Sequence, residues 1–185
     1  SGKKVLLMEM DLRKPGLSVK LDINNNIGFT NYILSPGLHV NDIVKPSAIH
    51  ESLYLISSGP IPPNPAEILM SSRTSELIEV LKEEFDYIII DAPPIGVVTD
   101  AQLLSPYADM CLYLVRQNYT FKNQINIVNY LFLSEKMKRI GIIVNGIKET
   151  SGYGYGYGYG YGYGYGNYEG TKRKTLLNRF NNIKN

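Results

Sequence analysis

The 185-residue sequence predicts an α/β fold in which a doubly wound, mostly parallel sheet is covered by helices on both faces. Two observations lead to this prediction. Short, continuously apolar runs alternate with helix-like segments over residues 1–149, and polar side chains directly follow several of these runs. With 44% hydrophobic and 19% charged residues, the chain has enough apolar sequence for one core, so we expect one globular domain.

Five apolar runs are the expected strands. Continuous hydrophobicity, rather than alternation, is typical of strands that are buried on both faces of a sheet. The runs are Val5–Met10, Leu53–Ile56, Tyr87–Ile90, Cys111–Val115 and Ile140–Val144. Because helix-like segments separate most of them, we expect βαβ crossovers and parallel pairing.

The expected helices lie between these runs. In chain order they are Phe29–Leu34, a helix that begins near Ala66, Ser75–Glu84 and Lys122–Met137. The surrounding residues 16–47 are irregular and are expected to form surface helices and loops. Residues 57–65 contain too much proline and glycine for regular structure.

The chain changes character after residue 149. Seven consecutive Gly-Tyr pairs run from Gly152 to Tyr165. Glycine at every second position raises the entropic cost of ordering, so a disordered, Tyr/Gly-rich tail is expected. The predicted organisation is an α/β domain at 1–149, a flexible Gly-Tyr cluster at 150–170 and a basic tail at 171–185.

Charge is divided unevenly along the chain. Residues 1–150 carry 14 Lys/Arg and 16 Asp/Glu, a net charge of −2, whereas residues 151–185 carry 5 and 1, a net charge of +4. The faintly acidic body argues against nucleic acid as a partner. No run is long enough to span a bilayer, and no signal peptide is expected at the N-terminus.

Cysteine and histidine are sparse. The single Cys111 excludes an internal disulfide, favours a reducing, cytoplasmic compartment, and is expected to be buried and inert. His39 and His50 have no suitably spaced partners, so no transition-metal site is expected.

Two carboxylates come at the end of the first expected strand. Ligands of open α/β sheets bind beyond the carboxyl ends of the strands, where Glu9 and Asp11 would lie. Residues two apart in a strand face the same side, so both carboxylates can converge on one Mg²⁺ ion or one attacking hydroxyl. Arg13 and Lys14 could neutralise phosphate beside them. The alternative is that all four are solvated loop residues.

A second acid follows another expected strand. Asp91 ends the apolar run Tyr87–Ile90 and precedes Ala-Pro-Pro, as in a Walker B motif, whose Asp holds Mg²⁺. Asp100, in contrast, is expected to cap a helix together with Thr99.

Together these motifs resemble the bacterial tyrosine autokinases (BY-kinases), the P-loop kinase domains of the capsule and exopolysaccharide co-polymerases. Glu9–Pro15 is similar to their Walker A′ motif and Asp91–Pro94 to their Walker B motif, and a tyrosine-rich C-terminus follows. The resemblance implies a P-loop NTPase-like fold with ATP and Mg²⁺ as cofactors. It implies Asp11 and Asp91 as Mg²⁺ ligands and Glu9 as the group that orients the tyrosine hydroxyl.

Further roles follow from the resemblance. Arg13 would help to bind the nucleotide phosphates, and Asn145, by analogy with related P-loop ATPases, would contact the base. Arg116 occupies a similar position at the end of a strand but has no assigned role. The phosphoacceptors would be Tyr153, Tyr155, Tyr157, Tyr159, Tyr161, Tyr163, Tyr165 and Tyr168.

The resemblance also implies partners. They are a membrane-embedded polysaccharide co-polymerase segment in the same polypeptide, at the bacterial inner membrane, and a counteracting phosphotyrosine phosphatase. We further hypothesise that unphosphorylated tails dock in trans and hold a ring of copies together. Each phosphotyrosine adds a charge of about −1.5 to −2, so bulk phosphorylation would expel the tail from an acidic site.

The sequence departs from the family pattern at two points. Glu9 stands where the family usually has Asp, and no Gly-x-x-x-x-Gly-Lys-[Ser/Thr] occurs in the 185 residues. We therefore expect an N-terminally truncated domain that lacks the upstream P-loop strand and helix. Because P-loop amides and a lysine hold the nucleotide phosphates, these residues alone are expected to be inactive.

Two other functions remain open. A partition- or septum-placement-type ATPase would share the fold and the acids at the strand ends, and would use dimerisation rather than phosphotransfer. A non-catalytic module could use the Gly-Tyr run for adhesive contacts. The tyrosine tail favours the kinase over the ATPase.

Overall fold

The computed structural model describes residues 2–95, 99–137 and 139–148, so the expectations for the Gly-Tyr cluster and the basic tail lie outside the described residues. The elements are β1 (Val5–Glu9), α1 (Leu17–Lys20), α2 (Phe29–Leu34), α3 (Val40–Ile43), β2 (Lys45–Pro46), β3 (Leu53–Ile56), α4 (Pro65–Leu69), α5 (Ser72–Glu84), β4 (Tyr87–Asp91), α6 (Asp100–Leu104), the 3₁₀ turn η1 (Ser105–Tyr107), β5 (Cys111–Arg116), α7 (Lys122–Leu133) and β6 (Ile140–Asn145).

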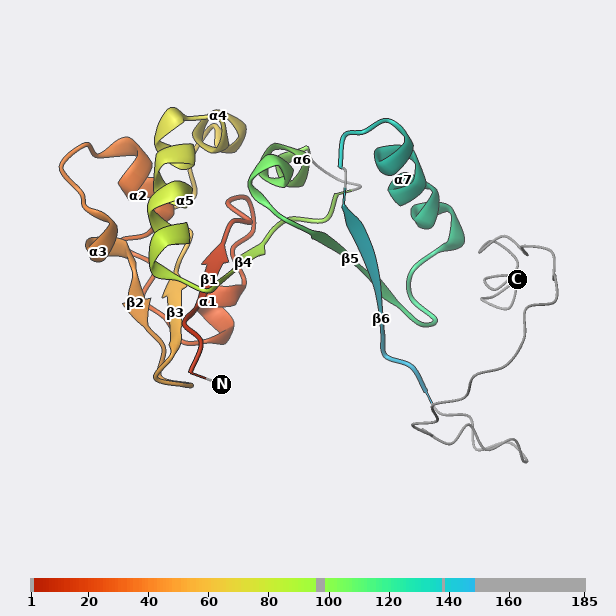
Figure 1. Cartoon of the computed structure of the whole chain (residues 1–185), viewed down its shortest axis with the longest axis horizontal. Coiled ribbons are helices and arrows are strands. Elements are labelled where there is room, and N and C mark those ends of the chain that lie inside the picture. The colour runs from red at the N-terminus through yellow and green to blue at the C-terminus, as the bar shows by residue number, and fades with distance from the viewer. Residues whose placement is uncertain (1, 96–98, 138, 149–185) are drawn as a thin grey trace, which may run out of the picture.

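The strands form two sheets (Figure 1). In the four-stranded sheet the order is β2-β3-β1-β4, with β1 parallel to both β3 and β4 and the short β2 antiparallel to β3. Strands β5 and β6 form a separate parallel pair, and α6 lies between the two sheets in the view of Figure 1. All five expected strands are present, and the parallel pairing is confirmed. The division into two sheets and the antiparallel edge strand were not predicted.

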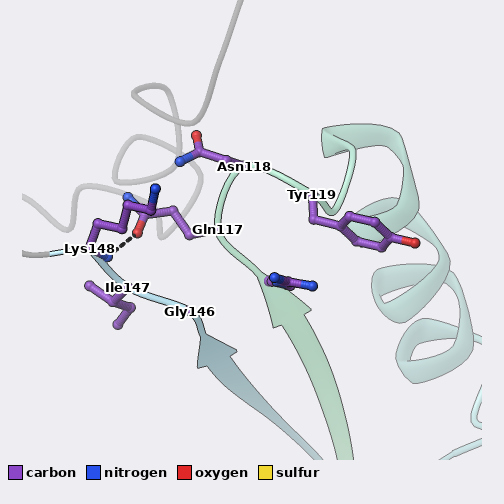
Figure 2. Close-up of a pocket in the computed structure, with 7 residues that line it drawn as sticks. Gln117, Asn118, Tyr119, Gly146, Ile147 and Lys148 are labelled. Atoms are coloured by element: carbon purple, nitrogen blue, oxygen red, sulfur yellow. Dashed lines mark hydrogen bonds between the residues drawn. The ribbon is translucent and has the colours of Figure 1, made fainter.

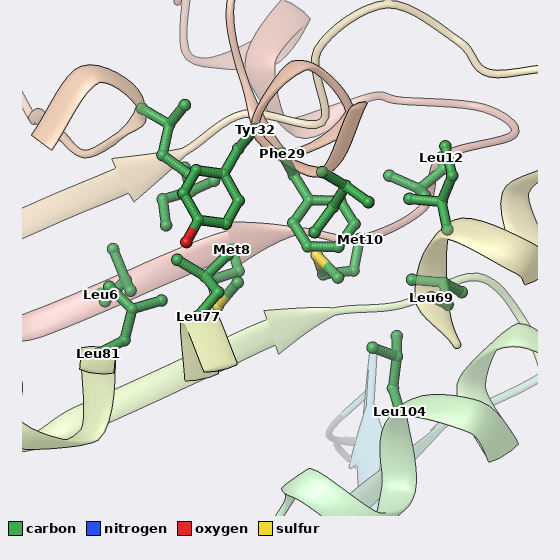
Figure 3. Packing of buried hydrophobic residues seen from close by; sticks show 14 of the residues in the cluster. Leu6, Met8, Met10, Leu12, Phe29, Tyr32, Leu69, Leu77, Leu81 and Leu104 are labelled. Atoms are coloured by element: carbon green, nitrogen blue, oxygen red, sulfur yellow. The ribbon is translucent and has the colours of Figure 1, made fainter. Parts of the chain in front are cut away.

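One face of the four-stranded sheet carries the core (Figure 3). Alternate side chains Leu6 and Met8 of β1 point into it and are fully buried. Helix α5 packs Leu77 and Leu81 against them, as the 3.6-residue period of an amphipathic helix requires. The core therefore fixes the direction in which β1 delivers the residues that follow it.

Residues 16–47 contribute more to the core than was predicted. We expected surface helices, but Phe29, Tyr32 and Ile33 of α2 are buried. The start of α2 lies directly against the loop after β3, because the Phe29 amide donates to the Ser57 carbonyl at 2.8 Å. A Cβ at Gly28 would lie 2.3 Å from that same carbonyl oxygen, so the close approach requires glycine.

Two helix boundaries differ from the prediction. Helix α5 begins three residues earlier than Ser75, because the Ser71 hydroxyl accepts a hydrogen bond from the Arg73 amide and caps the helix. Helix α7 ends at Leu133 rather than Met137, and Glu135 then adopts a left-handed φ of 55° that no helix can continue through.

The expectation that the strands are buried on both faces is wrong for β4, β5 and β6. Tyr87 and Ile89 of β4 are 59% and 54% exposed, and Leu112 and Leu114 of β5 are 54% and 62% exposed. The described helices therefore leave these side chains of the strands uncovered. Among the described helices, none is long and apolar enough to cross a membrane.

Candidate active site

The predicted acids gather at the carboxyl edge of the four-stranded sheet. Glu9, the last residue of β1, is directly opposite Asp91, the last residue of β4. Asp11 follows two residues after β1 ends. The charges of Asp11 and Glu9 both act on Asp91, so the three carboxylates belong to one electrostatic cluster.

Glu9 is held inside the fold. Its side chain is 1% exposed, and its Oε1 accepts hydrogen bonds from the Leu17 amide at 2.7 Å, the Ser18 amide at 2.9 Å and the Ser18 hydroxyl at 3.2 Å. Its Oε2 accepts from the Ser58 amide at 3.1 Å. Burial alone would raise the pKa of Glu9, but these four donors outweigh it and hold the pKa below its usual value.

This geometry differs from the role expected for Glu9. The strand ends at Glu9, so the rule that residues two apart share a face does not extend to Asp11. The carboxylate of Glu9 joins β1 to the start of α1 and to the loop after β3. A carboxylate with four donors and a lowered pKa is a poor acceptor for the proton of a tyrosine hydroxyl.

Asp11 and Asp91 are better placed for a ligand. The Oδ1 of Asp11 accepts from the amides of Arg13 at 3.3 Å and Lys14 at 3.0 Å, which folds the loop back over the strand end. The carboxylate of Asp91 makes no hydrogen bond or ion pair with any described residue. Burial raises its pKa, and the charges of Asp11 and Glu9 raise it further, against a smaller opposing effect of Lys20.

These two carboxylates fit Mg²⁺. The described residues contain no cluster of three or more His, Cys, Asp or Glu side chains that could enclose a metal. Mg²⁺ bound with a nucleotide typically uses only one or two carboxylates and takes its other ligands from phosphates and water. Asp91, which forms no ion pair with a described residue, meets that requirement.

Arg13 and Asp100 form an ion pair that the sequence did not predict. Asp100 is fully buried and receives two hydrogen bonds from Arg13, from Nε at 2.8 Å and from Nη2 at 3.1 Å. The expectation that Asp100 acts as a helix cap is wrong, because it is the first residue of α6 and its oxygens bind the guanidinium. Thr99 occupies the cap position without a side-chain hydrogen bond. The ion pair ties the loop after β1 to α6.

A polar hollow lies at the ends of the other sheet (Figure 2). It has a volume of about 500 Å³ and is lined by Arg116, Gln117, Asn118, Tyr119, Gly146, Ile147 and Lys148. The Arg116 guanidinium lies 5.6 Å from the centre of the Tyr119 ring. Gln117 accepts a hydrogen bond from the Lys148 amide at 2.7 Å and so joins the two strand ends. None of the three acids lines this hollow.

Asn145 lies beside the hollow and pairs with Arg116 across β5 and β6. Its Oδ1 accepts a hydrogen bond from the Gly146 amide at 2.7 Å, and its carbonyl accepts from the Gln117 amide at 3.0 Å. Its side-chain NH₂ makes no hydrogen bond with the described residues. That donor is the part of Asn145 that could reach a nucleotide base.

The other candidates from the sequence are the single cysteine, the two histidines and the C-terminal tyrosines. Cys111 is half-buried rather than buried, and burial raises the pKa of its thiol, which keeps it protonated and unreactive. His39 and His50 are exposed. The predicted phosphoacceptor tyrosines lie outside the described residues.

The sequence-based search missed the partners of Glu9. Ser58 follows the end of β3 and therefore reaches the same edge of the sheet as Glu9 and Asp91, a position that the strand pattern could have indicated. Ser18 had no such signal, since only the fold of the loop after β1 brings it back to Glu9.

The fold and the acids at the ends of adjacent parallel strands define a P-loop NTPase-type domain. The cell-division ATPase MinD shares this fold. In the MinC:MinD complex of Aquifex aeolicus the TM-score is 0.62 at 23% identity, over 80% of this chain and 58% of that chain. No protein-family model matches the chain.

More similar proteins narrow the class. "Tyrosine-protein kinase YwqD" of Bacillus subtilis is 37% identical over 147 residues, which is 80% of this chain and 61% of the relative. "Putative tyrosine-protein kinase CapB" of Staphylococcus aureus is 32% identical over 145 residues, 78% of this chain and 63% of the relative. The kinase domain of the Escherichia coli tyrosine kinase ETK has a TM-score of 0.73 at 26% identity, over 86% of this chain and 62% of that chain.

Over about four fifths of its length the chain is therefore similar to bacterial tyrosine-protein kinases. The resemblance to the BY-kinases and the P-loop NTPase-type fold are both confirmed. The chain spans 61% and 63% of the length of the two curated relatives.

Proposed function

We propose that the whole protein transfers the γ-phosphoryl group of MgATP to tyrosines of its own C-terminal cluster. The observation that supports this most is the pairing of two features, an anionic cluster at the sheet edge and eight tyrosines between Tyr153 and Tyr168 of the same chain. In this reaction the tyrosine oxygen bonds to the γ-phosphorus and its hydroxyl proton passes to solvent water, while the bond to the β-phosphate oxygen breaks and ADP leaves.

In this proposal each residue of the site has a separate role. Asp11 and Asp91 would hold Mg²⁺, which neutralises charge on the phosphates. Glu9 would keep Asp11 in place through its contacts with the start of α1, a positioning role instead of the hydroxyl-orienting role expected from the sequence. The side-chain NH₂ of Asn145 would contact the base, and Arg13, while paired with Asp100, would still present Nη1 toward a phosphate.

An experiment on the whole protein tests this function. Phosphotyrosine, detected by antibody and located by mass spectrometry, is expected on the Gly-Tyr cluster and is expected to disappear in Asp91→Asn. The matched control is Asp109→Asn, which changes an exposed acid away from the site and is expected to leave phosphorylation unchanged. Unaltered phosphorylation in Asp91→Asn would contradict the proposal.

The 185 residues alone are not expected to bind ATP tightly. Asp11 and Asp91 repel the phosphates, and the chain contains no glycine-rich loop with a lysine to offset that repulsion. A titration with fluorescent ATP measures this directly. Mg²⁺-dependent binding at micromolar concentration would contradict the expectation.

The tail would then act as a switch. We propose that unphosphorylated tails dock at the site of a neighbouring copy and hold a ring together, and that the charge added by many phosphotyrosines releases them. Replacing one tyrosine by Phe is expected to leave release intact, whereas replacing all eight is expected to abolish it. Loss of release in any single variant, measured by sedimentation of the whole protein, would show that one particular tyrosine controls it.

The setting of this activity is also a proposal. We propose a cytoplasmic location for these residues, attached to a polysaccharide co-polymerase segment in the inner membrane, with a phosphotyrosine phosphatase that resets the tail. The kinase family of the relatives supports this setting. Phosphorylation that changes the amount of exported capsular or extracellular polysaccharide is the expected consequence.

A further inference from the structure

Three of the tyrosines that the structure describes are more than half exposed. The exposed fractions are 59% for Tyr87, 73% for Tyr119 and 57% for Tyr130. In a phosphoryl transfer the acceptor oxygen has to come within about 3–3.5 Å of the phosphorus atom. A tyrosine can therefore be an acceptor only where its hydroxyl is unengaged and where the surrounding structure lets the hydroxyl approach another protein.

Tyr87 and Tyr130 do not meet these conditions. Tyr87 begins β4 and pairs with Val5 of β1, so its ring stands among the neighbouring side chains of a sheet face rather than ahead of them. The Tyr130 hydroxyl accepts a hydrogen bond from Lys136 Nζ at 3.2 Å, and the same ammonium lies 5.0 Å from the centre of the Tyr130 ring. Exposure alone does not make either tyrosine an acceptor.

Tyr119 lies in the turn between β5 and α7 (Figure 2). The Arg116 carbonyl accepts hydrogen bonds from the amides of Tyr119 at 3.1 Å and Thr120 at 3.0 Å, and the Thr120 hydroxyl accepts one from the Arg116 amide at 2.8 Å. Asn118 adopts a left-handed φ of 62° within this turn. The Tyr119 hydroxyl makes no hydrogen bond with a described residue, and Figure 2 shows its ring pointing away from Lys148. The turn thus presents an unengaged phenol.

The sequence around Tyr119 has the charge character of the Gly-Tyr cluster. Residues 110–134 contain no Asp or Glu, and neither do residues 151–168. No Asp or Glu lines the polar hollow beside Tyr119 either. An acid next to the acceptor would be repelled by the three acids of the candidate site and by the nucleotide phosphates. Tyr119 therefore meets the same electrostatic requirement as the tyrosines of the cluster.

We propose that Tyr119 is a further phosphoacceptor, modified at the site of a second copy of the protein. This inference rests on the proposed function. The Tyr119 oxygen bonds to the γ-phosphorus of MgATP and its hydroxyl proton passes to solvent water, while the bond from the γ-phosphorus to the bridging oxygen breaks and ADP leaves. A second copy is required, because the turn is held by three hydrogen bonds on the β5–β6 sheet, which carries none of the three acids.

The added phosphate would lie beside a cation. The Arg116 guanidinium is 5.6 Å from the centre of the Tyr119 ring and makes no hydrogen bond with the described residues. A phosphotyrosine carries a charge of about −1.5 to −2, and a guanidinium pairs with phosphate through two parallel N–H donors. Because Arg116 also lines the polar hollow, this pairing would withdraw its charge from the hollow. Phosphorylation of Tyr119 is therefore expected to weaken nucleotide binding beside Asn145.

Phosphorylation of one copy by another tests the proposal. The acceptor is the isotope-labelled whole protein with Asp91→Asn, and the kinase is the unlabelled wild-type whole protein with MgATP. Mass spectrometry is expected to find at least tenfold more phosphate on Tyr119 of the labelled copy than on Tyr130, the matched exposed tyrosine. Equal phosphate on the two tyrosines, or phosphate on Tyr119 of the labelled copy incubated without the wild type, would overturn the proposal.

Nucleotide affinity tests the consequence for the polar hollow. With all eight cluster tyrosines replaced by Phe, the whole protein phosphorylated at Tyr119 is expected to bind MgADP at least threefold more weakly than before phosphorylation. Arg116→Met is expected to remove this difference, and Tyr119→Phe is expected to show no change after incubation with MgATP. Equal affinities before and after phosphorylation would contradict the withdrawal of Arg116 from the hollow.

Failure of this inference is distinguishable from failure of the proposed function. Phosphate on the Gly-Tyr cluster with none on Tyr119 overturns the inference and leaves the proposed function in place. The absence of phosphate from every tyrosine of the whole protein contradicts both.

Discussion

The four-stranded sheet and the β5–β6 pair use similar apolar sequence in different ways. In the first region, Leu6 and Met8 are fully buried, and the acid that follows them, Glu9, is held by four hydrogen bonds. In the second region, Leu112 and Leu114 are more than half exposed, and Arg116 at the strand end makes no side-chain hydrogen bond with the described residues.

The difference shows what a strand needs besides hydrophobicity. Strand β1 has partners on both edges and a layer of helices over its core face. Among the described residues, strand β5 has one partner strand and one covering helix, so half of its apolar surface contributes little to stability. In the first region a packed core lies directly before the acids. In the second region apolar side chains of the strands remain exposed.

The largest expected difference between the two regions is in the free energy of unfolding that is lost when a leucine is replaced by alanine. Leu77→Ala opens a cavity in the core and is expected to lower the free energy of unfolding by about 2–5 kcal/mol. Leu114→Ala removes a side chain that is 62% exposed and is expected to change it by no more than about 0.5 kcal/mol. Urea denaturation of the 185-residue chain measures both. Similar losses in the two variants would show that the regions are equally packed.

A smaller effect on stability tests the contribution of the hydrogen bonds that Glu9 accepts. Glu9→Gln is expected to lower the free energy of unfolding by about 1–3 kcal/mol at pH 7, because an amide NH₂ would replace one of two oxygens that both accept hydrogen bonds. The pKa of Glu9 is lowered in the fold, so its stabilisation is present above the usual pKa of Glu and is lost as pH falls through the lowered value.

The difference between wild type and Glu9→Gln should therefore shrink toward low pH, as followed by thermal unfolding. The matched control is Glu79→Gln, which changes an exposed Glu that pairs only with Lys82 on the surface of α5. A pH-independent loss in Glu9→Gln would mean that packing rather than charge carries the contribution of Glu9.

The smallest expected effect is a stabilisation of the fold by a substitution at Asp91. Burial, Asp11 and Glu9 raise the pKa of Asp91 in the fold, so ionisation of Asp91 opposes folding above the usual pKa of Asp. Asp91→Asn is expected to raise the melting temperature at pH 7 and to leave it unchanged below about pH 3, where the wild-type carboxyl is also neutral. A lower melting temperature at pH 7 would show that Asp91 has a stabilising partner.

Much of this site followed from the strand pattern. Apolar runs that end in Glu9, Asp11 and Asp91 indicated one edge of a parallel sheet, and the sheet brings all three together. The pattern did not indicate that Glu9 turns inward, or that Asp100 binds Arg13. Both contacts join residues from different elements, and their side chains carry no periodicity that a sequence can display.

The amino-acid sequence by itself determined the type and order of the strands, the identity of the acids at their ends and the eight tyrosines that follow, because these depend on local hydrophobic pattern and composition. Only the tertiary structure decided which of the two carboxylates, that of Glu9 or that of Asp91, is hydrogen-bonded to other described residues. Four donors from two separate segments, the start of α1 and the loop after β3, converge on Glu9, and no donor of the described residues reaches the carboxylate of Asp91. Tertiary structure also decided that the apolar side of β4 and β5 stays exposed, because burial depends on which elements meet in space and not on the hydrophobicity of one strand.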